Sequence, residues 1–101
     1  MIEQPAYMGA LRQQDPAFYD LIDAMLEKAK GKGDLDRKTK VLILLALGAA
    51  GSDVAAVKSL STEARSIGAS EGEIVETMRL AFIGAGIPGL VAGLAAFEGV
   101  S

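Results

Sequence analysis

The sequence predicts an all-α protein, a single-domain bundle of about five helices that associates into an oligomer. Three observations support this fold class: apolar residues recur at helical spacing, no segment alternates as a half-buried strand does, and the connections are short. Half of the 101 residues are hydrophobic, a high share for a chain that can bury only one small core. We therefore expect part of the apolar surface to be covered by further copies of the chain.

The N-terminal residues 1–14 show no clear apolar period, and we expect an arm there, followed by a helical domain that spans residues 15–101. The first helix of that domain begins where Asp15 can cap it and Pro16 can occupy its first position. Apolar side chains then recur at helical spacing until Gly31, the first of two glycines that end the helix.

A second helix is expected to open at Asp34 or Asp36 and to stop at Gly51. Its body, VLILLALGAA, is apolar on every side, which is typical of a helix surrounded by other helices. We therefore predict that this is the central helix of the bundle.

The stretch GSDVAAVKSL at residues 51–60 begins a third helix, capped by Ser52 or Asp53 and closed by Gly68. Unpaired backbone N–H groups and the helix dipole favour negative charge at such an entry, which is also where proteins lower the pKa of a cysteine. Neither a thiol nor an imidazole follows in this stretch. The entry is therefore either a site whose chemistry is missing or simply the start of a structural helix.

A capping box formed by Ser70 and Glu73 opens the fourth helix. The glycine-rich stretch GAGIPG at residues 84–89 should break it, and a short, alanine-rich fifth helix follows to about Phe97. GAGIPG also matches the dinucleotide-binding pattern G-x-G-x-x-G, but a helix rather than a strand precedes it. We interpret it as a helix break and expect no cofactor.

The charge and composition exclude several classes of function. Ten basic and thirteen acidic residues give a net charge of −3 without a basic tract, so we expect no nucleic-acid partner. The chain has no cysteine and no histidine, which removes disulfides, the commonest metal ligands and the usual proton carrier at neutral pH. We expect no metal site.

Residues 80–97 form an uncharged stretch of 18 residues, close to the lower limit for a membrane-spanning helix. Pro88 lies near its middle between Gly86 and Gly89, so we predict two short helices packed against other helices and no membrane span. The first residues lack a basic segment followed by an apolar run, and we therefore expect a cytoplasmic protein.

Three cations, Arg37, Lys38 and Lys40, cluster at the start of the second helix, where the helix dipole disfavours positive charge. They are expected either to pair with carboxylates within or between subunits or to bind an anion.

Three segments together resemble the carboxymuconolactone decarboxylase family, which includes the alkylhydroperoxidase D branch: the DPAF entry, LDRKTKVLILLALGAAG, and RSIGASEGEIVETMRLAFIGAGIPGLVAGLAAFE. The resemblance runs from Asp15 to Glu98, and its most specific parts are K-T-K at residues 38–40 and I-G-A-S-x-x-E-I at residues 67–74. It implies a helical bundle of the alkylhydroperoxidase D-like type that forms a homotrimer or homohexamer. The fifth helix and the break at residues 84–89 are then expected in the interface.

In the redox branch of that family, a glutamate follows the K-T-K pattern and a C-x-x-C-x-x-x-H sequence begins the next helix. By this resemblance the glutamate position falls on Val41, the cysteine positions on Asp53 and Ala56, and the histidine position on Leu60. All four residues are replaced. Thiol peroxidase and disulfide reductase activities are excluded, because both need a thiolate and the chain has none.

Two functions remain open. The first is a non-redox member of the family that binds a small acidic or apolar ligand or a protein partner, or that acts mainly as an assembly. The alternative is an enzyme of lactone or carboxylate chemistry led by Asp53, as the decarboxylase branch implies. An enzyme needs a polar, accessible cavity beside Asp53, whereas a lost site should be filled by Val41, Ala56 and Leu60.

Overall fold

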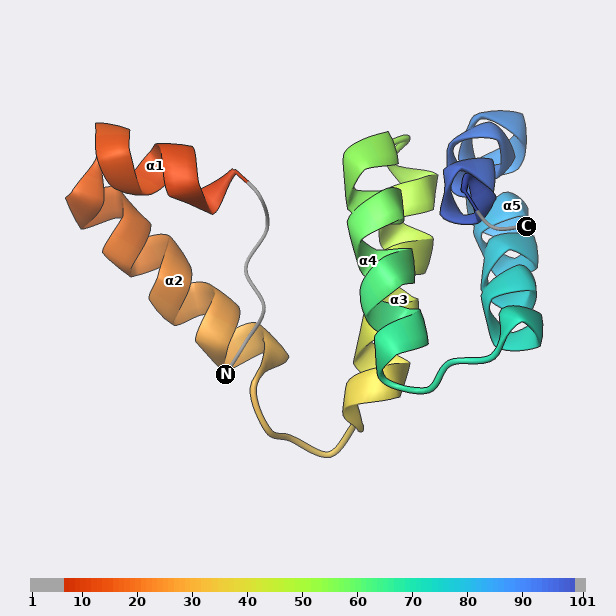
Figure 1. Ribbon diagram of the computed structural model, residues 1–101, viewed down its shortest axis with the longest axis horizontal. Helices are drawn as coiled ribbons and strands as arrows, with labels where there is room; N and C mark the ends of the chain where they lie inside the picture. The colour runs from red at the N-terminus through yellow and green to blue at the C-terminus, as the bar shows by residue number, and fades with distance from the viewer. Residues whose placement is uncertain (1–6, 100–101) are drawn as a thin grey trace. The chain divides into compact units, whose positions relative to one another are not determined.

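The computed structural model describes residues 7–99, and all of its regular elements are helical (Figure 1). No strand occurs among these residues, which confirms the predicted all-α fold class. The elements are α1 (Met8–Gln14), α2 (Pro16–Lys30), α3 (Arg37–Ala50), α4 (Val54–Ser66), α5 (Glu71–Gly93) and the 3-10 helix η1 (Leu94–Phe97).

The chain divides into two compact units, residues 1–34 and residues 35–101. In the first unit α1 packs against α2, and Met8 is the residue of α1 that is buried. Residues 8–14 of the expected arm form this helix, residues 1–6 lie outside the described residues, and the arm itself stays a prediction. A helix of seven residues spans two turns, which is too short to show an apolar period in the sequence. The assignment of residues 15–101 to one domain stays a prediction.

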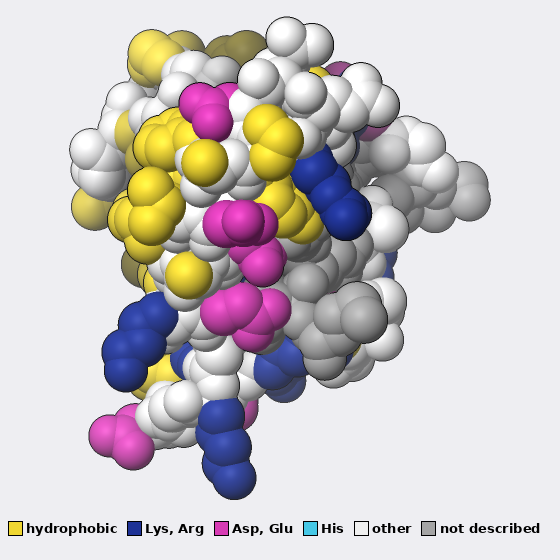
Figure 2. Space-filling model, turned by 90° about the vertical axis from the view of Figure 1, so that its left-hand side faces the viewer, with side chains coloured by type: hydrophobic (Ala, Val, Ile, Leu, Met, Phe, Trp, Pro, Cys, Tyr) yellow, Lys and Arg dark blue, Asp and Glu magenta, His cyan; other side chains and the backbone are white. Residues whose placement is uncertain are grey.

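The helix α2 begins as predicted, with the Asp15 carboxylate accepting a hydrogen bond of 3.1 Å from the backbone N–H of Phe18. None of its side chains is fully buried, and Phe18, Leu21 and Met25 form an exposed apolar stripe. Figure 2 shows a face on which apolar side chains gather beside a row of carboxylates. An apolar stripe of this kind needs a further surface to cover it.

In the second unit α3 packs against both α4 and α5, as the prediction of a central helix requires. Asp36, not Asp34, is its cap and accepts a hydrogen bond of 2.7 Å from the N–H of Thr39. Burial follows one face, at Val41, Leu45 and Ala49. Since Leu47 is 62% exposed, the predicted burial on every side is not reached within a single chain.

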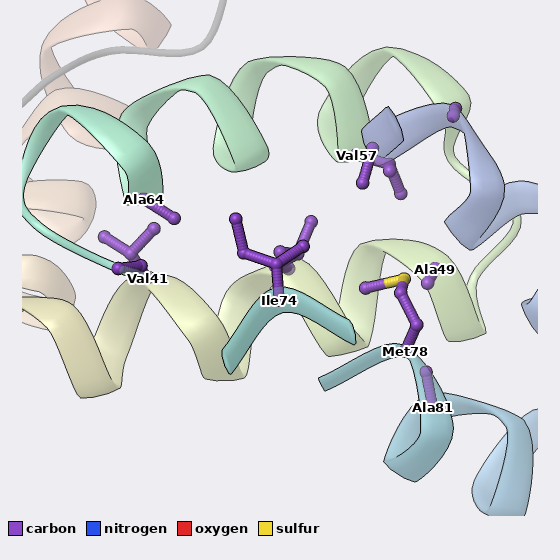
Figure 3. Close-up of a cluster of buried hydrophobic side chains, with 11 residues drawn as sticks. Val41, Ala49, Val57, Ala64, Ile74, Met78 and Ala81 are labelled. Carbon is purple, nitrogen blue, oxygen red and sulfur yellow. The ribbon is translucent and has the colours of Figure 1, made fainter. Parts of the chain in front are cut away.

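The core of the second unit lies between α3, α4 and α5 (Figure 3). Ile74 points from α5 into the middle of this cluster and is fully buried. Val41 and Ala64 lie together at one end, and Val57 and Met78 lie toward the other. Most other members are alanines, so the backbones of the three helices can approach one another closely.

The connection between α4 and α5 is fixed by local hydrogen bonds. Gly68 adopts a positive φ of 98°, and the N–H groups of Gly68 and Ala69 donate to the carbonyls of Arg65 and Ala64 in a Schellman motif. Ser70 and Glu73 then form the predicted capping box, with reciprocal bonds of 2.8 and 3.0 Å. These two motifs fix the turn into α5 locally, and the burial of Ala69 in the core and the ion pair between Lys38 and Glu73 add tertiary contacts to it.

The glycine-rich stretch breaks α5 as predicted, at Gly86, whose φ of 69° and ψ of −155° are not helical. The break divides α5 into a first limb, residues 71–85, and a second limb, residues 87–93, which continues into η1. The predicted fifth helix corresponds to the second limb and η1 together.

By length and composition alone, the stretch Glu71–Phe97 would be apolar enough to cross a membrane. However, neither limb of α5 reaches the roughly 20 continuous helical residues that a bilayer requires. The first limb also packs against α3 and carries buried core residues.

Candidate functional site

The entry of α4 is a tight turn that ends in a side-chain cap. Gly51 and Asp53 donate backbone hydrogen bonds of 2.9 Å to the carbonyls of Leu47 and Gly48, and Ser52 between them has a positive φ of 57°. The Asp53 carboxylate then accepts a hydrogen bond of 3.0 Å from the N–H of Ala56. Of the two caps considered, Asp53 is therefore the one used, and its side chain is exposed to solvent.

The other three residues that the resemblance places at the family's redox positions are apolar and face the interior to different degrees. Val41 is 4% exposed and belongs to the core, and Leu60 is half-buried and packs against the core. Ala56 is also half-buried and faces Gly48 of α3 so closely that a Cβ on that glycine would lie 3.4 Å from the Ala56 methyl group. Side chains without titratable groups thus occupy these positions.

The structure brings some of the four residues together and separates others. Asp53 and Ala56 share the capping hydrogen bond in the first turn of α4, and Leu60 lies one turn further on. Val41 lies beside Ala64, toward the other end of α4, and is not adjacent to Asp53 (Figure 3). A proton relay from position 41 to position 53 would need intermediate groups that these side chains cannot supply.

The cation cluster at the start of α3 is paired with carboxylates of the same chain. Arg37 contacts Glu63 at 3.3 Å, and Lys38 contacts Glu73 at 3.0 Å. Of the two interpretations from the sequence, carboxylate pairing is therefore confirmed for these two cations. Both pairs tie α3 to neighbouring helices in the second unit.

Asp36 and Glu73, which both lie at helix starts, have lowered pKa values. Hydrogen bonds from the side chain and backbone of Thr39 lower the pKa of Asp36. The backbone N–H of Ser70, followed by the Lys38 ammonium, lowers the pKa of Glu73. Both groups are thereby held as anions, which suits capping and ion pairing but not proton donation at neutral pH.

A polar groove of about 320 Å³ lies between α4 and the C-terminal part of the chain and includes Lys58, Ser61, Thr62, Arg65 and Glu98. Lys58 pairs with Glu98 at 2.8 Å, and Arg65 pairs with Glu71 through two hydrogen bonds of 2.6 and 2.8 Å. Ser61 and Thr62 both donate their hydroxyl protons to the carbonyl of Lys58. The polar groups of this groove already have partners within the chain.

An apolar groove of about 490 Å³ lies between the two limbs of α5 and η1. One of its lining residues, Arg79, is charged, and the others are Val75, Met78, Leu80, Phe82, Ile83, Leu90, Leu94 and Phe97. Asp53 does not line the apolar groove or the polar groove. The sequence analysis missed Arg79, although it is the one basic residue in the stretch from Ile74 to Phe97.

Comparison with known proteins decides the family. A sequence profile of the carboxymuconolactone decarboxylase family matches residues 16–99, which is most of the chain. The chain belongs to this family. This confirms the resemblance inferred from the sequence, and the absence of cysteine agrees with the loss of the C-x-x-C-x-x-x-H motif.

Two relatives extend this family assignment. An uncharacterised protein of Methanocaldococcus jannaschii, MJ1511, is 32% identical over 78 residues, which are 77% of this chain and 73% of the relative. The crystal structure of apo-lpg0406, a carboxymuconolactone decarboxylase family protein from Legionella pneumophila, matches with a TM-score of 0.83 and 27% identity. That match covers 90% of this chain and 81% of the Legionella chain, and it supports the predicted helical fold of the family.

Proposed function

We propose that this chain is a non-redox, cytoplasmic member of the carboxymuconolactone decarboxylase family that binds a small molecule and assembles with copies of itself. One observation carries the proposal: the four redox positions hold Val41, Asp53, Ala56 and Leu60, of which Asp53 alone is ionisable and serves as a helix cap. The remaining three are apolar and at least half-buried, as expected of a lost site that is filled. The interruption of the α5 helix at Gly86 argues against a membrane span.

The alternative, an Asp53-led enzyme of lactone or carboxylate chemistry, has less support. The Asp53 carboxylate accepts a hydrogen bond at a helix N-terminus, where its charged form is favoured, so it is a poor proton donor. Neither the apolar groove nor the polar groove brings a second polar group to it. To act as a general base, Asp53 would need a substrate that binds on the exposed turn before α4.

Two assays on the purified chain test the proposal. Hydrogen peroxide consumption is measured with dithiothreitol as reductant, and carboxymuconolactone conversion is followed by the release of carbon dioxide. We expect neither reaction to exceed the rate without protein. Lactone conversion by the wild type would support the alternative if Asp53→Asn abolished it, because asparagine caps a helix about as well as aspartate but carries no charge.

The position of the lost redox site is tested by restoring its cysteines. In Asp53→Cys/Ala56→Cys the two thiols lie three residues apart in the first turn of α4 and should close an intrachain disulfide on oxidation, detected by mass spectrometry as the loss of two hydrogens. The matched control is Asp53→Cys/Ala55→Cys, whose side chains do not face each other on the helix. Equal disulfide yields from both variants would contradict the assignment of positions 53 and 56.

A further inference from the structure

Arg79 differs from the other cations of the second unit. Among residues 35–99, Arg37, Lys38, Lys58 and Arg65 each form an ion pair, and Lys40 also has an interaction partner. Arg79 has no ion pair, hydrogen bond or ring contact with any described residue. The nearest carboxylate along its helix, Glu76, does not pair with it and does not line the apolar groove.

The surroundings of Arg79 are apolar. On the first limb of α5 it lies on the same face as Val75, Met78, Phe82 and Ile83, which follow the spacing of one helical stripe. Beyond the break at Gly86, residues of the second limb and η1 form the opposite wall. The apolar groove therefore combines a hydrocarbon-like lining with a single guanidinium, and its volume of about 490 Å³ falls within the range of small-molecule sites.

We propose that the apolar groove binds an amphipathic carboxylate, whose hydrocarbon part lies along the limbs of α5 and whose carboxylate pairs with Arg79. A guanidinium presents a planar pair of donors that matches a carboxylate, and the lining offers no carboxylate that would compete for it. The hydrocarbon part is held by the removal of apolar surface from water. This inference rests on the proposed function and specifies the class of its ligand.

A two-fold contact between copies of the chain fits the apolar groove less well. In a two-fold contact centred on this groove, the same surface would face itself and both Arg79 side chains would be buried together. The lining contains no acid, so each guanidinium would lose water without gaining a counter-charge. A free carboxylate supplies that charge.

The experiment is isothermal titration calorimetry of the full-length protein with decanoate, below its micelle concentration, and with decanol. We expect decanoate to bind at one site per chain, and each methylene added to the fatty acid to tighten binding about fourfold. Arg79→Gln should weaken decanoate binding at least tenfold while leaving decanol binding unchanged. Ile83→Asn should weaken the binding of both ligands, because this side chain lines the apolar groove. Ile83 is 80% exposed, so it can be replaced without disturbing the buried core.

Lys58→Gln is the matched control, because it removes one positive charge from the polar groove and should leave decanoate affinity unchanged. The proposal is overturned if decanoate does not bind, or if Arg79→Gln and Lys58→Gln lose affinity equally. If decanoate fails to bind and Ile83→Asn dissociates the oligomer in light scattering, the proposal is overturned and the apolar groove is occupied by a second copy of the chain. The peroxide and lactone assays do not involve this groove, so a negative titration leaves the non-redox assignment intact.

Discussion

Position 53 carries a carboxylate where the family resemblance places a cysteine. The resemblance places a cysteine there in the redox branch, and a thiolate and a carboxylate are both anions that the first turn of a helix stabilises. The Asp53 carboxylate uses this environment to accept the N–H of Ala56. The local electrostatics of the entry are thus compatible with either residue, whereas the chemistry depends on the atom that carries the charge.

Gly86 is the residue whose replacement should affect the fold most directly. Its φ of 69° lies in the region that strains residues with a Cβ, so Gly86→Ala is expected to destabilise the protein by about 1–2 kcal/mol. Gly84→Ala is the matched control, because a Cβ there meets no atom within 4 Å and alanine favours a helix. Urea unfolding followed by circular dichroism measures both changes. A neutral or stabilising effect of Gly86→Ala would mean that the break does not depend on the positive φ.

At the scale of the element, four helices start in the same way. The side chains of Asp15, Asp36, Asp53 and Ser70 each accept the backbone N–H of the residue three positions later, at 2.7–3.1 Å. Caps of this kind depend on a few neighbouring residues, so the sequence was sufficient to predict these starts, although it left two alternatives at α3 and at α4. It could not predict that α1 is helical, because this helix is too short to show an apolar period. Nor could it predict that Arg79 has no partner among residues 7–99, because that depends on tertiary neighbours.

The capped helix starts should make stability depend on pH. Asp36, Glu71 and Glu73 have pKa values below their ordinary ones, through hydrogen bonds to Thr39, Arg65 and Ser70 respectively. A carboxyl whose pKa is lowered by folding stabilises the folded state above its unfolded pKa, and this contribution is lost as the pH falls through the folded pKa. We expect a lower urea midpoint at pH 3 than at pH 7, with the loss beginning below about pH 4.

Glu73→Gln should reduce this difference, since it removes one of the titrating groups while leaving an amide that can still accept the N–H of Ser70. The control is Ser70→Ala, which breaks the capping box and is expected to cost about 1 kcal/mol at pH 7. Equal urea midpoints at pH 3 and pH 7 in the wild type would contradict the role of these carboxylates.

At the scale of the whole molecule, apolar surface exceeds what one chain can bury. Leu47, Ile87 and Val91 all remain more than 60% exposed, and the unit formed by residues 1–34 is too short to be stable by itself. Composition predicted this excess, because half of the residues are hydrophobic. Composition could not show that part of this exposed apolar surface lines the apolar groove, because the groove depends on the angle between the two limbs of α5 at Gly86.

Self-association is the expected outcome. In light scattering at micromolar concentration we predict a mass three or six times the 10.4 kDa of one chain. Ile87→Glu/Val91→Glu should lower this mass, because both side chains are exposed on the second limb of α5 and neither lines the apolar groove. Leu21→Glu, at an exposed position of α2, tests in the same way whether the first unit contributes contacts between subunits. A monomeric wild type would refute the assembly.

Because the chain contains no cysteine, a thiol placed at Asp53 or Ala56 would be its only one. Its ionisation could be titrated at the entry of α4 with neither a second cysteine nor a histidine nearby. The departure of its pKa from the ordinary value of about 8.5 would then measure what the turn and the helix contribute without other catalytic groups. If positions 53 and 56 correspond to the redox cysteines, as the resemblance implies, this chain offers a reference background in which the acidity conferred by the helix entry is separated from that conferred by a second cysteine and a histidine.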